Sequence, residues 1–599
     1  MLKNKKLLFA ISSLGLGHAT RTMAVVNHFK KDNEITIISY GNALNFLKKE
    51  LSGDNIEFIP FVDYPNLERG KGLSFYFYLL IDLIKTNLII REERKYTKEI
   101  EKRFDFIFSD GRYGIFSKKI PSFLLSHQIS FIPPNGLSAF SFFADLGNYL
   151  YFKNFNELFI PDFENFENSL AGKLSHPKFL KYLNYEFIGL LSSYDKKEIP
   201  EDIDYLFVIS GYLKEHKDNF ISKLIENSKK LKGSKVFVLG DTSHDDIQTL
   251  EEYDITIYPS VSSDIREEFF ARAKVIISRT GYTTIMDLVE LDKKAILFPT
   301  PNQSEQEYLA KFHMHKNNFV ICEDSQNFDL QELILKLPIT KPYIPESKTK
   351  DSLEKIEKKA EEYFIHNFFS IIIPAYNEAK YISKTLEKLS VLEYDNFEII
   401  IVENGSSDNT FKIASSYKET IPKLKVYQSP KGVSKAKNVG LSKVSEDSNW
   451  VIFLDADTEL ESRFLKDLNN YLNKNKNNNL CVGTCEILAS DSKTLYSKLW
   501  LKFYDLGHKL TQTSYSMQIA KTDIAQGIKF DEELNYSEDL KFIRNMQIFG
   551  EFFFFNTKEV LTSVRRFEKD GYLRTLIYWN IQAFTPEFLK KNKNYKSIR

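Results

Sequence analysis

Cysteine is almost absent from this chain of 599 residues, which contains only Cys322, Cys481 and Cys485. Three cysteines cannot build a disulfide framework in a chain of this length, so we predict a reducing, cytoplasmic environment. Cys481 and Cys485 form a C-x3-C pair with no second Cys/His pair nearby. We therefore interpret them as core residues of a strand rather than as metal ligands.

An excess of charge of one sign is also absent, since 81 Lys and Arg residues balance 81 Asp and Glu residues. The chain as a whole has no electrostatic attraction for nucleic acid, and we predict no nucleic-acid partner. Hydrophobic residues make up 43% and charged residues 27%, which excludes a disordered chain. At about 150 residues per domain, the length allows roughly four compact units.

Long hydrophobic runs are missing as well. The closest approach to a membrane-spanning segment is residues 73–90, which Asp82, Lys85 and Asn87 interrupt. We interpret this segment as an amphipathic helix that either packs against the core or rests on a membrane as a peripheral contact. The basic start of the chain precedes only a short apolar run at 7–11, which does not match a signal peptide.

Short apolar runs alternate with helical stretches along the whole chain, a pattern typical of βα units with parallel sheets. The strands that we expect in the first two series lie near 7–12, 35–39, 105–108 and 122–126, and near 206–210, 236–239, 255–258, 275–278 and 295–298. Residues 341–366 are polar and charged, and they predict a linker followed by a solvated helix. A third series begins at Phe369.

Two acidic residues end a predicted strand of this third series. Asp455 and Asp457 follow the apolar run 451–454, at the carboxyl end of a strand, where open α/β sheets bind their ligands. Alternate residues of an extended chain point the same way, so the two carboxylates can converge on one ligand. They suit Mg²⁺ or Mn²⁺, which would also hold a diphosphate. Alone, the pair is a weak signal, because two acids in a surface turn are common.

Further segments accompany this pair in a fixed order. They are 371–378 (IIIPAYNE), 400–410 (IIVENGSSDNT), 527–532 (GIKFDE) and 536–539 (YSED). The ordered set resembles glycosyltransferase family 2 over about residues 367–599. The resemblance implies a GT-A fold and a single displacement with inversion. In that reaction, an acceptor hydroxyl loses its proton on one face of the sugar while the departing diphosphate is neutralised on the other.

The resemblance also assigns roles position by position. Asp539 would be the general base, Asp457 would bind the metal on the diphosphate, and Asp455 would contact the metal together with sugar or ribose. The residues that would line the nucleotide base and ribose are Pro374, Tyr376, Glu403 and Asn404. Many family members carry two acids where Glu403 and Asn404 stand, so base recognition differs here.

Three basic residues are candidates for binding phosphate. Many family members carry an Arg where Lys437 stands, and Lys keeps the charge but loses the bidentate fork. Arg565 and Arg566 follow a predicted strand and would bind a donor or acceptor phosphate, unless they form an exposed basic turn.

A glycine-rich loop follows the first predicted strand of the chain, where residues 12–21 read SSLGLGHATR. Glycines let a backbone approach a ligand, and a helix N-terminus favours negative charge. A dinucleotide-binding loop is excluded, because Thr20 stands where a third glycine is needed and the strand 35–39 ends without the acid that binds ribose. His18 follows the turn at the carboxyl edge of the predicted sheet, where a base would be placed.

A second loop, 278–284 (SRTGYTT), joins a strand to a helix, and the segment 303–307 (QSEQE) follows the next strand. With the first loop it resembles glycosyltransferase family 28 and its GT-B relatives, over about residues 1–340. The resemblance makes His18 the catalytic base or an acceptor-side polar group. It implies no metal, since backbone amides and the helix dipole would stabilise the leaving diphosphate. The residues that would bind the donor are Ser210, Gly211, Arg279, Thr280, Gly281, Asp287, Gln306 and Glu307. Alternatively, Thr283 and Thr284 simply cap the helix.

The predicted fold class is α/β, with a GT-B fold of two Rossmann-like domains fused to a GT-A nucleotide-sugar-binding domain. We expect domains at 1–195 and 196–340, a linker with a helix at 341–366, and the family 2 domain at 367–599. The implied function is a bifunctional inverting glycosyltransferase that moves sugars from nucleotide-sugar donors, such as UDP-sugars, to a glycan or lipid-linked acceptor of the cell envelope. Two alternatives stay open for the GT-B half: a non-catalytic binding module and a nucleotide-sugar epimerase.

Overall fold

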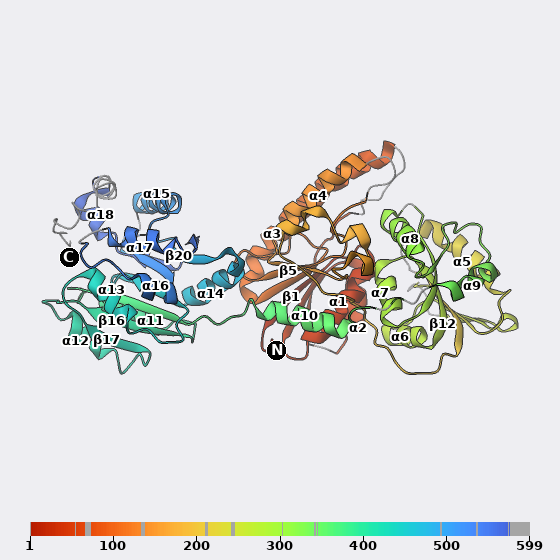
Figure 1. Cartoon of the computed structure of the whole chain (residues 1–599), viewed down its shortest axis with the longest axis horizontal. Helices are drawn as coiled ribbons and strands as arrows, with labels where there is room; N and C mark the ends of the chain where they lie inside the picture. Colours follow the sequence, from red (N-terminus) through yellow and green to blue (C-terminus); the bar gives the residue numbers. More distant parts are fainter. Residues whose placement is uncertain are drawn as a thin grey trace. The chain divides into compact units, whose positions relative to one another are not determined.

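The computed structural model describes residues 2–574, except 54, 66–72, 133–137, 210–213, 241–245, 302, 341–342, 344, 492–493, 515, 535–536 and 573. The chain divides into two compact units, Met1–Glu361 and Glu362–Arg599. Both units are built of helices and largely parallel sheets (Figure 1). The apolar runs of the sequence predict such sheets. Strands of a parallel sheet are covered on both faces, so their residues are apolar in continuous runs.

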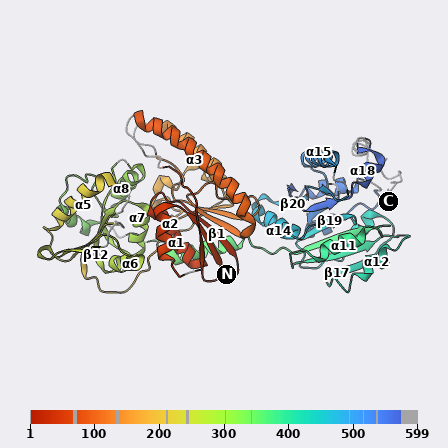
Figure 2. The same cartoon turned by 180° about the vertical axis from the view of Figure 1, so that it is seen from behind.

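The first half of the first unit contains, within the described residues, a seven-stranded parallel sheet in the order β3-β2-β1-β4-β5-β6-β7. Its strands are β1 (Lys6–Ile11), β2 (Glu34–Ser39), β3 (Ile56–Pro60), β4 (Phe106–Asp110), β5 (Ser122–Leu125), β6 (Glu157–Ile160) and β7 (Tyr185–Phe187). The helices that connect them are α1 (Leu16–Phe29), α2 (Gly41–Glu50), α3 (Leu73–Ile100) and α4 (Ser138–Phe152). Helix α3 extends well beyond the strands (Figure 1 and Figure 2).

The second half of this unit contains a second sheet, in the order β10-β11-β9-β8-β12-β13-β14. Its strands are β8 (Ile203–Val208), β9 (Lys235–Val238), β10 (Gln248–Leu250), β11 (Ile255–Tyr258), β12 (Ala273–Arg279), β13 (Lys294–Phe298) and β14 (Val320–Ile321). Its helices are α5 (Lys214–Ser228), α6 (Ser263–Arg272), α7 (Tyr282–Glu290), α8 (Ser304–Lys316) and α9 (Leu330–Leu335). Only the edge strand β10 pairs antiparallel among the described strands of this sheet.

Helix α10 (Thr349–Glu361) ends the first unit and packs against it. Ser352, Ile356 and Ala360 recur every fourth residue on one face and are at most 1% exposed. The Ser352 hydroxyl donates a hydrogen bond to the carbonyl of Ile188 at 2.5 Å. The sequence predicted a solvated helix here; the helix is present, but one of its faces is buried. Most residues of the helix are charged, but one row of residues along it is buried.

The second unit contains a mixed sheet in the order β17-β16-β15-β18-β22-β20-β23. Its strands are β15 (Phe369–Ala375), β16 (Phe397–Glu403), β17 (Leu424–Gln428), β18 (Trp450–Leu454), β20 (Leu480–Cys485), β22 (Met517–Lys521) and β23 (Glu551–Phe555). A small sheet joins β19 (Thr458–Leu460), β24 (Val560–Thr562) and β21 (Leu488–Ala489). The helices are α11 (Ile382–Ser390), α12 (Thr410–Ser416), α13 (Val433–Leu441), α14 (Phe464–Lys474), α15 (Leu495–Thr511), α16 (Thr522–Ile528), α17 (Glu538–Met546) and α18 (Arg565–Asp570).

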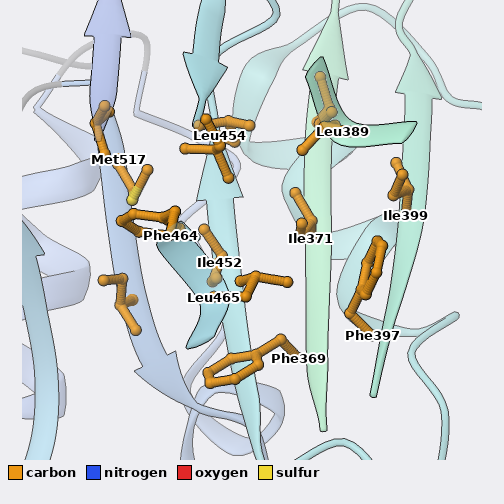
Figure 3. Packing of buried hydrophobic residues seen from close by; sticks show 14 of the residues in the cluster. Phe369, Ile371, Leu389, Phe397, Ile399, Ile452, Leu454, Phe464, Leu465 and Met517 are labelled. Carbon is orange, nitrogen blue, oxygen red and sulfur yellow. The ribbon is translucent and has the colours of Figure 1, made fainter. Parts of the chain in front are cut away.

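The core of the second unit lies on both faces of this sheet. On one face, Ile371, Ile399 and Ile452 pack with Phe464 and Leu465 of α14 (Figure 3). The register pairs Ile371 with Ile399 and with Ile452, so these side chains stand in one row across three strands. The alternate residues of the same strands pack into a second cluster with α13, α16 and α17. This two-sided burial holds the carboxyl ends of the strands in a fixed position.

The structure bears on two predictions from the sequence, the one for the cysteines and the one for membrane-spanning segments. Cys481 and Cys485 are buried free thiols of β20, which confirms their interpretation as core residues. Burial raises the pKa of the Cys485 thiol well above its usual value, which makes it unreactive. Among the described residues, no helix is both long and apolar enough to cross a membrane.

Gly483 in β20 leaves no room for a side chain. A Cβ there would lie 2.5 Å from the carbonyl oxygen of Phe553 on the neighbouring strand β23. We expect Gly483→Ala to lower the free energy of unfolding of the second unit by about 1–3 kcal/mol, because the two strands must move apart. Differential scanning calorimetry measures this loss as a lower unfolding temperature.

Gly527→Ala is the matched control for this substitution. A Cβ at Gly527 in α16 would meet no atom within 4 Å. Alanine also favours a helix over glycine, so we expect an unchanged or slightly raised unfolding temperature. Equal unfolding temperatures for the two variants would contradict the packing described at Gly483.

Candidate active sites

Neighbouring strands of the first sheet bring polar residues to one edge. Strand β1 leads into the turn before α1, which carries His18, while β4 ends at Asp110 and His127 follows β5. The strands β1, β4 and β5 are parallel neighbours, so their carboxyl ends meet at the same edge. Gly111 has a φ of +72°, and a Cβ there would lie 3.1 Å from Cε1 of His18. Glycine therefore lets the chain after β4 pass beside the imidazole.

The imidazole of His18 is held by Asp110. Its Nδ1 lies 2.7 Å from Oδ1 of Asp110, which is fully buried. Nη2 of Arg21 also lies 3.0 Å from Nδ1, but it lies closer to Oδ1 of Asp110 and donates there. A carboxylate only accepts hydrogen bonds, so a proton on Nδ1 satisfies the contact with Asp110 and leaves a lone pair on Nε2. The side chain of His18 is 26% exposed, so the ring stays accessible to a ligand. An imidazole held in this way can act as a general base.

A buried cation supports this pair. Arg21 is 2% exposed, its Nε donates to Oδ2 of Asp110 at 2.8 Å, and its Nη2 contacts Oδ1 of the same carboxylate. Burial opposes ionisation of Asp110, but Arg21 and His18 hold its pKa well below the usual range. The carboxylate is therefore charged at physiological pH and orients His18 permanently. Neither Arg21 nor Asp110 was predicted as a site residue, although Asp110 is the last residue of its strand and Asp455, which was predicted, directly follows one.

The second half of the unit carries the loop predicted to bind diphosphate. Thr280 is fully buried, its Oγ1 has no hydrogen-bond partner within the described residues, and Gly281 precedes the first turn of α7. The guanidinium of Arg279 lies 3.7 Å from the ring centroid of Phe220. Burial lowers the pKa of Arg279 to about 10, so it remains a cation at pH 7. The Thr283 hydroxyl donates to the carbonyl of Gly17 at 3.4 Å and so bridges to the first half.

The other predicted donor-binding residues have different surroundings. Asp287 is 8% exposed, and its Oδ1 accepts a hydrogen bond from the Ser192 hydroxyl at 2.5 Å. Burial raises the pKa of Asp287 to about 7. Oε1 of Gln306 accepts from the backbone N–H of Thr300 at 3.0 Å, whereas Glu307 is exposed. Ser210 and Gly211 lie outside the described residues.

In the second unit, the acidic pair stands at the carboxyl end of β18, where Asp455 is exposed and Asp457 is half-buried. Nη2 of Arg565 lies 2.9 Å from Oδ2 of Asp457 and 3.2 Å from Oε2 of Glu378. The guanidinium also lies 4.1 Å from the ring centroid of Tyr381. Arg565 is thus built into the site rather than part of an exposed basic turn. The side chain of Arg566 lies outside the described part of the chain.

A divalent cation fits the chemistry of this acidic pair. Carboxylate oxygens are the ligands that Mg²⁺ and Mn²⁺ prefer. The ion pair with Arg565 shows that Asp457 accepts a cationic partner. Within the described residues, no three His, Cys, Asp or Glu side chains gather closely enough to hold a metal. The phosphates of a donor would add further oxygen ligands.

Asp539, the predicted base of this unit, lies in the first turn of α17 and is paired with Lys437. Nζ of Lys437 lies 2.5 Å from Oδ1 of Asp539 and 3.8 Å from Oε1 of Glu538. Burial opposes the charge of Lys437, but Asp539 and Glu538 raise its pKa, so it stays a cation. Burial, with the charge of Asp539, raises the pKa of Glu538 to about 7. The structure thus makes Lys437 a counter-ion of the predicted base.

The residues predicted to line the nucleotide base come from the neighbouring strands β15 and β16. Pro374 lies in β15 and Tyr376 directly follows it, while Glu403 ends β16. One carboxylate oxygen of Glu403 accepts from Nε2 of Gln428 at 3.0 Å. Asn404 is 5% exposed, and its Oδ1 has no partner among the described residues. The four predicted residues therefore share one sheet edge with Asp455.

Comparison with known protein families agrees with the predicted order of the two halves of the chain. Residues 370–522 match glycosyl transferase family 2, and residues 217–363 match the glycosyltransferase family 28 C-terminal domain. The chain therefore carries glycosyltransferase domains of two families, in the order that the sequence predicted. The α/β fold class, with a GT-B-like half and a GT-A-like half, is confirmed.

Relatives with curated names are similar over part of their length. The minor teichoic acid biosynthesis protein GgaA of Bacillus subtilis (strain 168) is 28% identical over 237 residues, 38% of this chain and 45% of the relative. The poly(ribitol-phosphate) beta-N-acetylglucosaminyltransferase TarS of Staphylococcus aureus (strain MW2) is 26% identical over 182 residues, 29% of this chain and 31% of the relative. The chain thus spans less than half the length of these relatives. Among solved structures, the calicheamicin glycosyltransferase CalG4 is 14% identical with a TM-score of 0.40, covering 60% of this chain and 94% of that chain.

Asp287 gives the first unit a stability that depends on pH. Its pKa is about 7 in the folded chain, against about 3.9 for an unperturbed aspartate. The unfolded chain therefore loses this proton first. The contribution to stability is full below about pH 4 and is lost as the pH rises to about 7. We expect Asp287→Asn, which stays neutral, to stabilise the first unit at pH 8 by about 2–4 kcal/mol.

Denaturant unfolding of both proteins at pH 5 and pH 8 measures this effect, with a larger gain expected at pH 8. Glu332→Gln on the exposed surface of α9 is the control, and we expect it to change stability equally at both pH values. An equal gain from Asp287→Asn at both pH values would show that Asp287 is ionised in the folded chain.

Proposed function

We propose that the chain is a bifunctional inverting glycosyltransferase with one transfer site in each unit. One observation carries this proposal: each unit combines a base held by a counter-ion with a separate group that can bind an anion. In the first unit these are His18 with Asp110, and the loop of Thr280. In the second unit they are Asp539 with Lys437, and Arg565 beside Asp457.

In the first unit, His18 would take the proton of the acceptor hydroxyl. Asp110 would stabilise the imidazolium that forms, because its carboxylate is already charged and in contact with Nδ1. The backbone N–H groups at the start of α7 and the Arg279 cation would bind the leaving diphosphate. This transfer requires no metal.

In the second unit, Asp539 would take the proton of a second acceptor hydroxyl, while Lys437 balances the charges around it. Asp455 and Asp457 would hold Mg²⁺ or Mn²⁺, which when bound supplies positive charge for the diphosphate. Arg565 lies beside Asp457 and would bind an oxygen of the same diphosphate. Pro374, Tyr376, Glu403 and Asn404 would contact the base and ribose.

We propose UDP-sugars as donors and a glycan or lipid-linked acceptor of the cell envelope. The support comes from two relatives. One is named as a minor teichoic acid biosynthesis protein, and the other as a poly(ribitol-phosphate) beta-N-acetylglucosaminyltransferase. We also propose that the protein works in the cytoplasm, at the inner face of the cell membrane.

Substitution of one base or one metal-site acid should remove one transfer and leave the other intact. We expect His18→Ala to slow the transfer of the first unit about 10²–10⁴-fold, the usual contribution of a general base. We expect Asp457→Ala to slow the transfer of the second unit at least about 100-fold, because the charge of the diphosphate is no longer neutralised. Each transfer is measured separately with radiolabelled UDP-sugars and with each intermediate acceptor supplied.

The controls separate the two sites and the alternatives. A chelator should stop only the transfer of the second unit. If either substitution abolishes both transfers although each intermediate is supplied, two independent sites are excluded. Exchange of deuterium into C2 of the donor sugar would identify the first unit as an epimerase. Donor binding without turnover by the first unit would identify it as a binding module.

We propose a membrane contact through α3 and α4. On α3, Leu80, Ile84 and Leu88 are 62%, 56% and 53% exposed, and Phe142 on α4 is 68% exposed. The two helices are neighbours, because the Tyr151 hydroxyl on α4 donates to Asn87 on α3. The cations Lys85 and Arg91 are exposed on α3, and Lys153 is exposed directly after α4. An apolar surface with flanking cations suits an anionic bilayer.

Replacing apolar residues of α3 by acids should weaken this contact. We expect Ile84→Glu with Leu88→Glu to abolish cosedimentation with vesicles of phosphatidylglycerol and phosphatidylcholine, since carboxylates neither enter the bilayer nor bind its anions. Leu335→Glu with Ile339→Glu changes two residues that are even more exposed elsewhere in the unit, 78% and 67%, and should leave binding intact. Equal binding by both variants would refute the contact.

A further inference from the structure

The two halves of the first unit meet at the candidate active site through a pair formed by the buried His127 and the half-buried Glu305. His127 follows β5 in the first half, and Glu305 lies in the first turn of α8 in the second half. Nε2 of His127 lies 3.0 Å from Oε1 of Glu305. The imidazole is 7% exposed and stacks on the ring of Tyr282, with 4.1 Å between centroids and 3° between planes. Two elements of the second half thus hold His127.

Arg21 determines which nitrogen of His127 carries the proton. Nη1 of Arg21 lies 2.7 Å from Nδ1 of His127. A guanidinium has only donors, so Nδ1 must accept this hydrogen bond. The proton therefore resides on Nε2, which donates it to Glu305. Burial lowers the pKa of His127, in agreement with a neutral ring.

The contacts continue from His127 to the predicted base. The guanidinium of Arg21 is rigid and planar, and while Nη1 binds His127, Nε and Nη2 bind Asp110. Asp110 in turn holds Nδ1 of His18. Nη2 of Arg21 also lies 3.0 Å from Nδ1 of His18. A shift of His127 would therefore move Arg21, and with it the two groups that surround Nδ1 of His18. Glu305 directly precedes Gln306 and Glu307, which the family resemblance assigns to donor binding.

We propose that His127 and Glu305 are positioning residues, which act through Arg21 and Asp110 to hold His18 in its reactive orientation when the donor-binding half is seated against the acceptor half. This inference rests on the transferase function proposed above for the first unit. In this inference, binding of the donor to the second half is coupled to the orientation of His18 in the first half.

The charged and titratable groups around His18 come from every element packed there. They are Arg21 of α1, Asp63 after β3, Asp110 of β4, His127 after β5, Tyr282 of α7 and Glu305 of α8. The substitutions that test the inference leave Arg21, Asp63 and Asp110 in place. They remove the contacts of His127 and Glu305 one at a time.

His127→Phe keeps a ring of similar size against Tyr282 but removes both hydrogen bonds. We expect kcat of the first transfer to fall about tenfold with little change in the donor KM. The base His18 loses its orientation, whereas the groups that bind the donor are unchanged. Glu305→Ala should act in the same way. Glu305→Gln should restore at least about half of the activity, because its amide oxygen still accepts from Nε2.

A double-mutant cycle distinguishes positioning from a general structural role. If His127 acts through His18, His127→Phe has no further effect on kcat once His18 is Ala. A structural role predicts that the two losses multiply. His28→Phe is the matched control. It breaks another His–Glu pair of the same unit, with 3.0 Å between His28 and Glu357, and should leave kcat unchanged.

A measurement without turnover keeps the inference separate from the proposed function. Diethyl pyrocarbonate modifies imidazoles, and mass spectrometry of the peptide that contains His18 gives its rate in the full-length protein. We expect His127→Phe and Glu305→Ala to raise this rate several-fold, since the ring is released from Asp110, and His28→Phe to leave it unchanged. Unchanged rates in the first two variants, or multiplying losses of kcat, overturn the inference. A wild type that transfers no sugar while the rates still change overturns only the proposed function.

Discussion

Parallel pairing of strands is the constraint on which both units depend, because it brings the carboxyl ends of neighbouring strands to one edge of a sheet. His18 and Asp110 are 92 residues apart in the chain and are hydrogen-bonded at such an edge. In the second unit, the same constraint brings Glu403 at the end of β16 to the edge where Asp455 follows β18. The topology therefore decides where polar residues meet, and the residues then decide the chemistry.

The two units support their bases in opposite ways. The base candidate of the first unit, His18, becomes a cation when it accepts a proton, and the group that holds it is the carboxylate of Asp110. The base candidate of the second unit, Asp539, starts as an anion, and the group that holds it is the ammonium of Lys437. In each case the partner is more buried than the base. Burial keeps water from screening the pair and strengthens the interaction.

Much of the strand arrangement was predictable from the sequence, because buried parallel strands appear in it as continuous apolar runs. The runs at 371–373, 399–402 and 451–454 are such strands. Strand β10 escaped prediction because its three residues are exposed at a sheet edge. Arg21 and Glu305 escaped because polar residues of a helix usually face solvent, and only tertiary packing buries them. The partner of Asp287, Ser192, lies 95 residues away and has no local signal.

Two buried oxygens without partners in the described residues have a consequence for selectivity. Oγ1 of Thr280 and Oδ1 of Asn404 stand in the nucleotide-site candidates of the two units. A ligand that brings a hydrogen-bond donor to such an oxygen satisfies it, whereas an analogue without that donor leaves it unpaired at a cost of about 1–3 kcal/mol. At the proposed nucleotide sites, an analogue without the donor would therefore bind about 5- to 150-fold more weakly. Each site would then discriminate by binding the wrong nucleotide more weakly, rather than by binding the correct nucleotide more tightly.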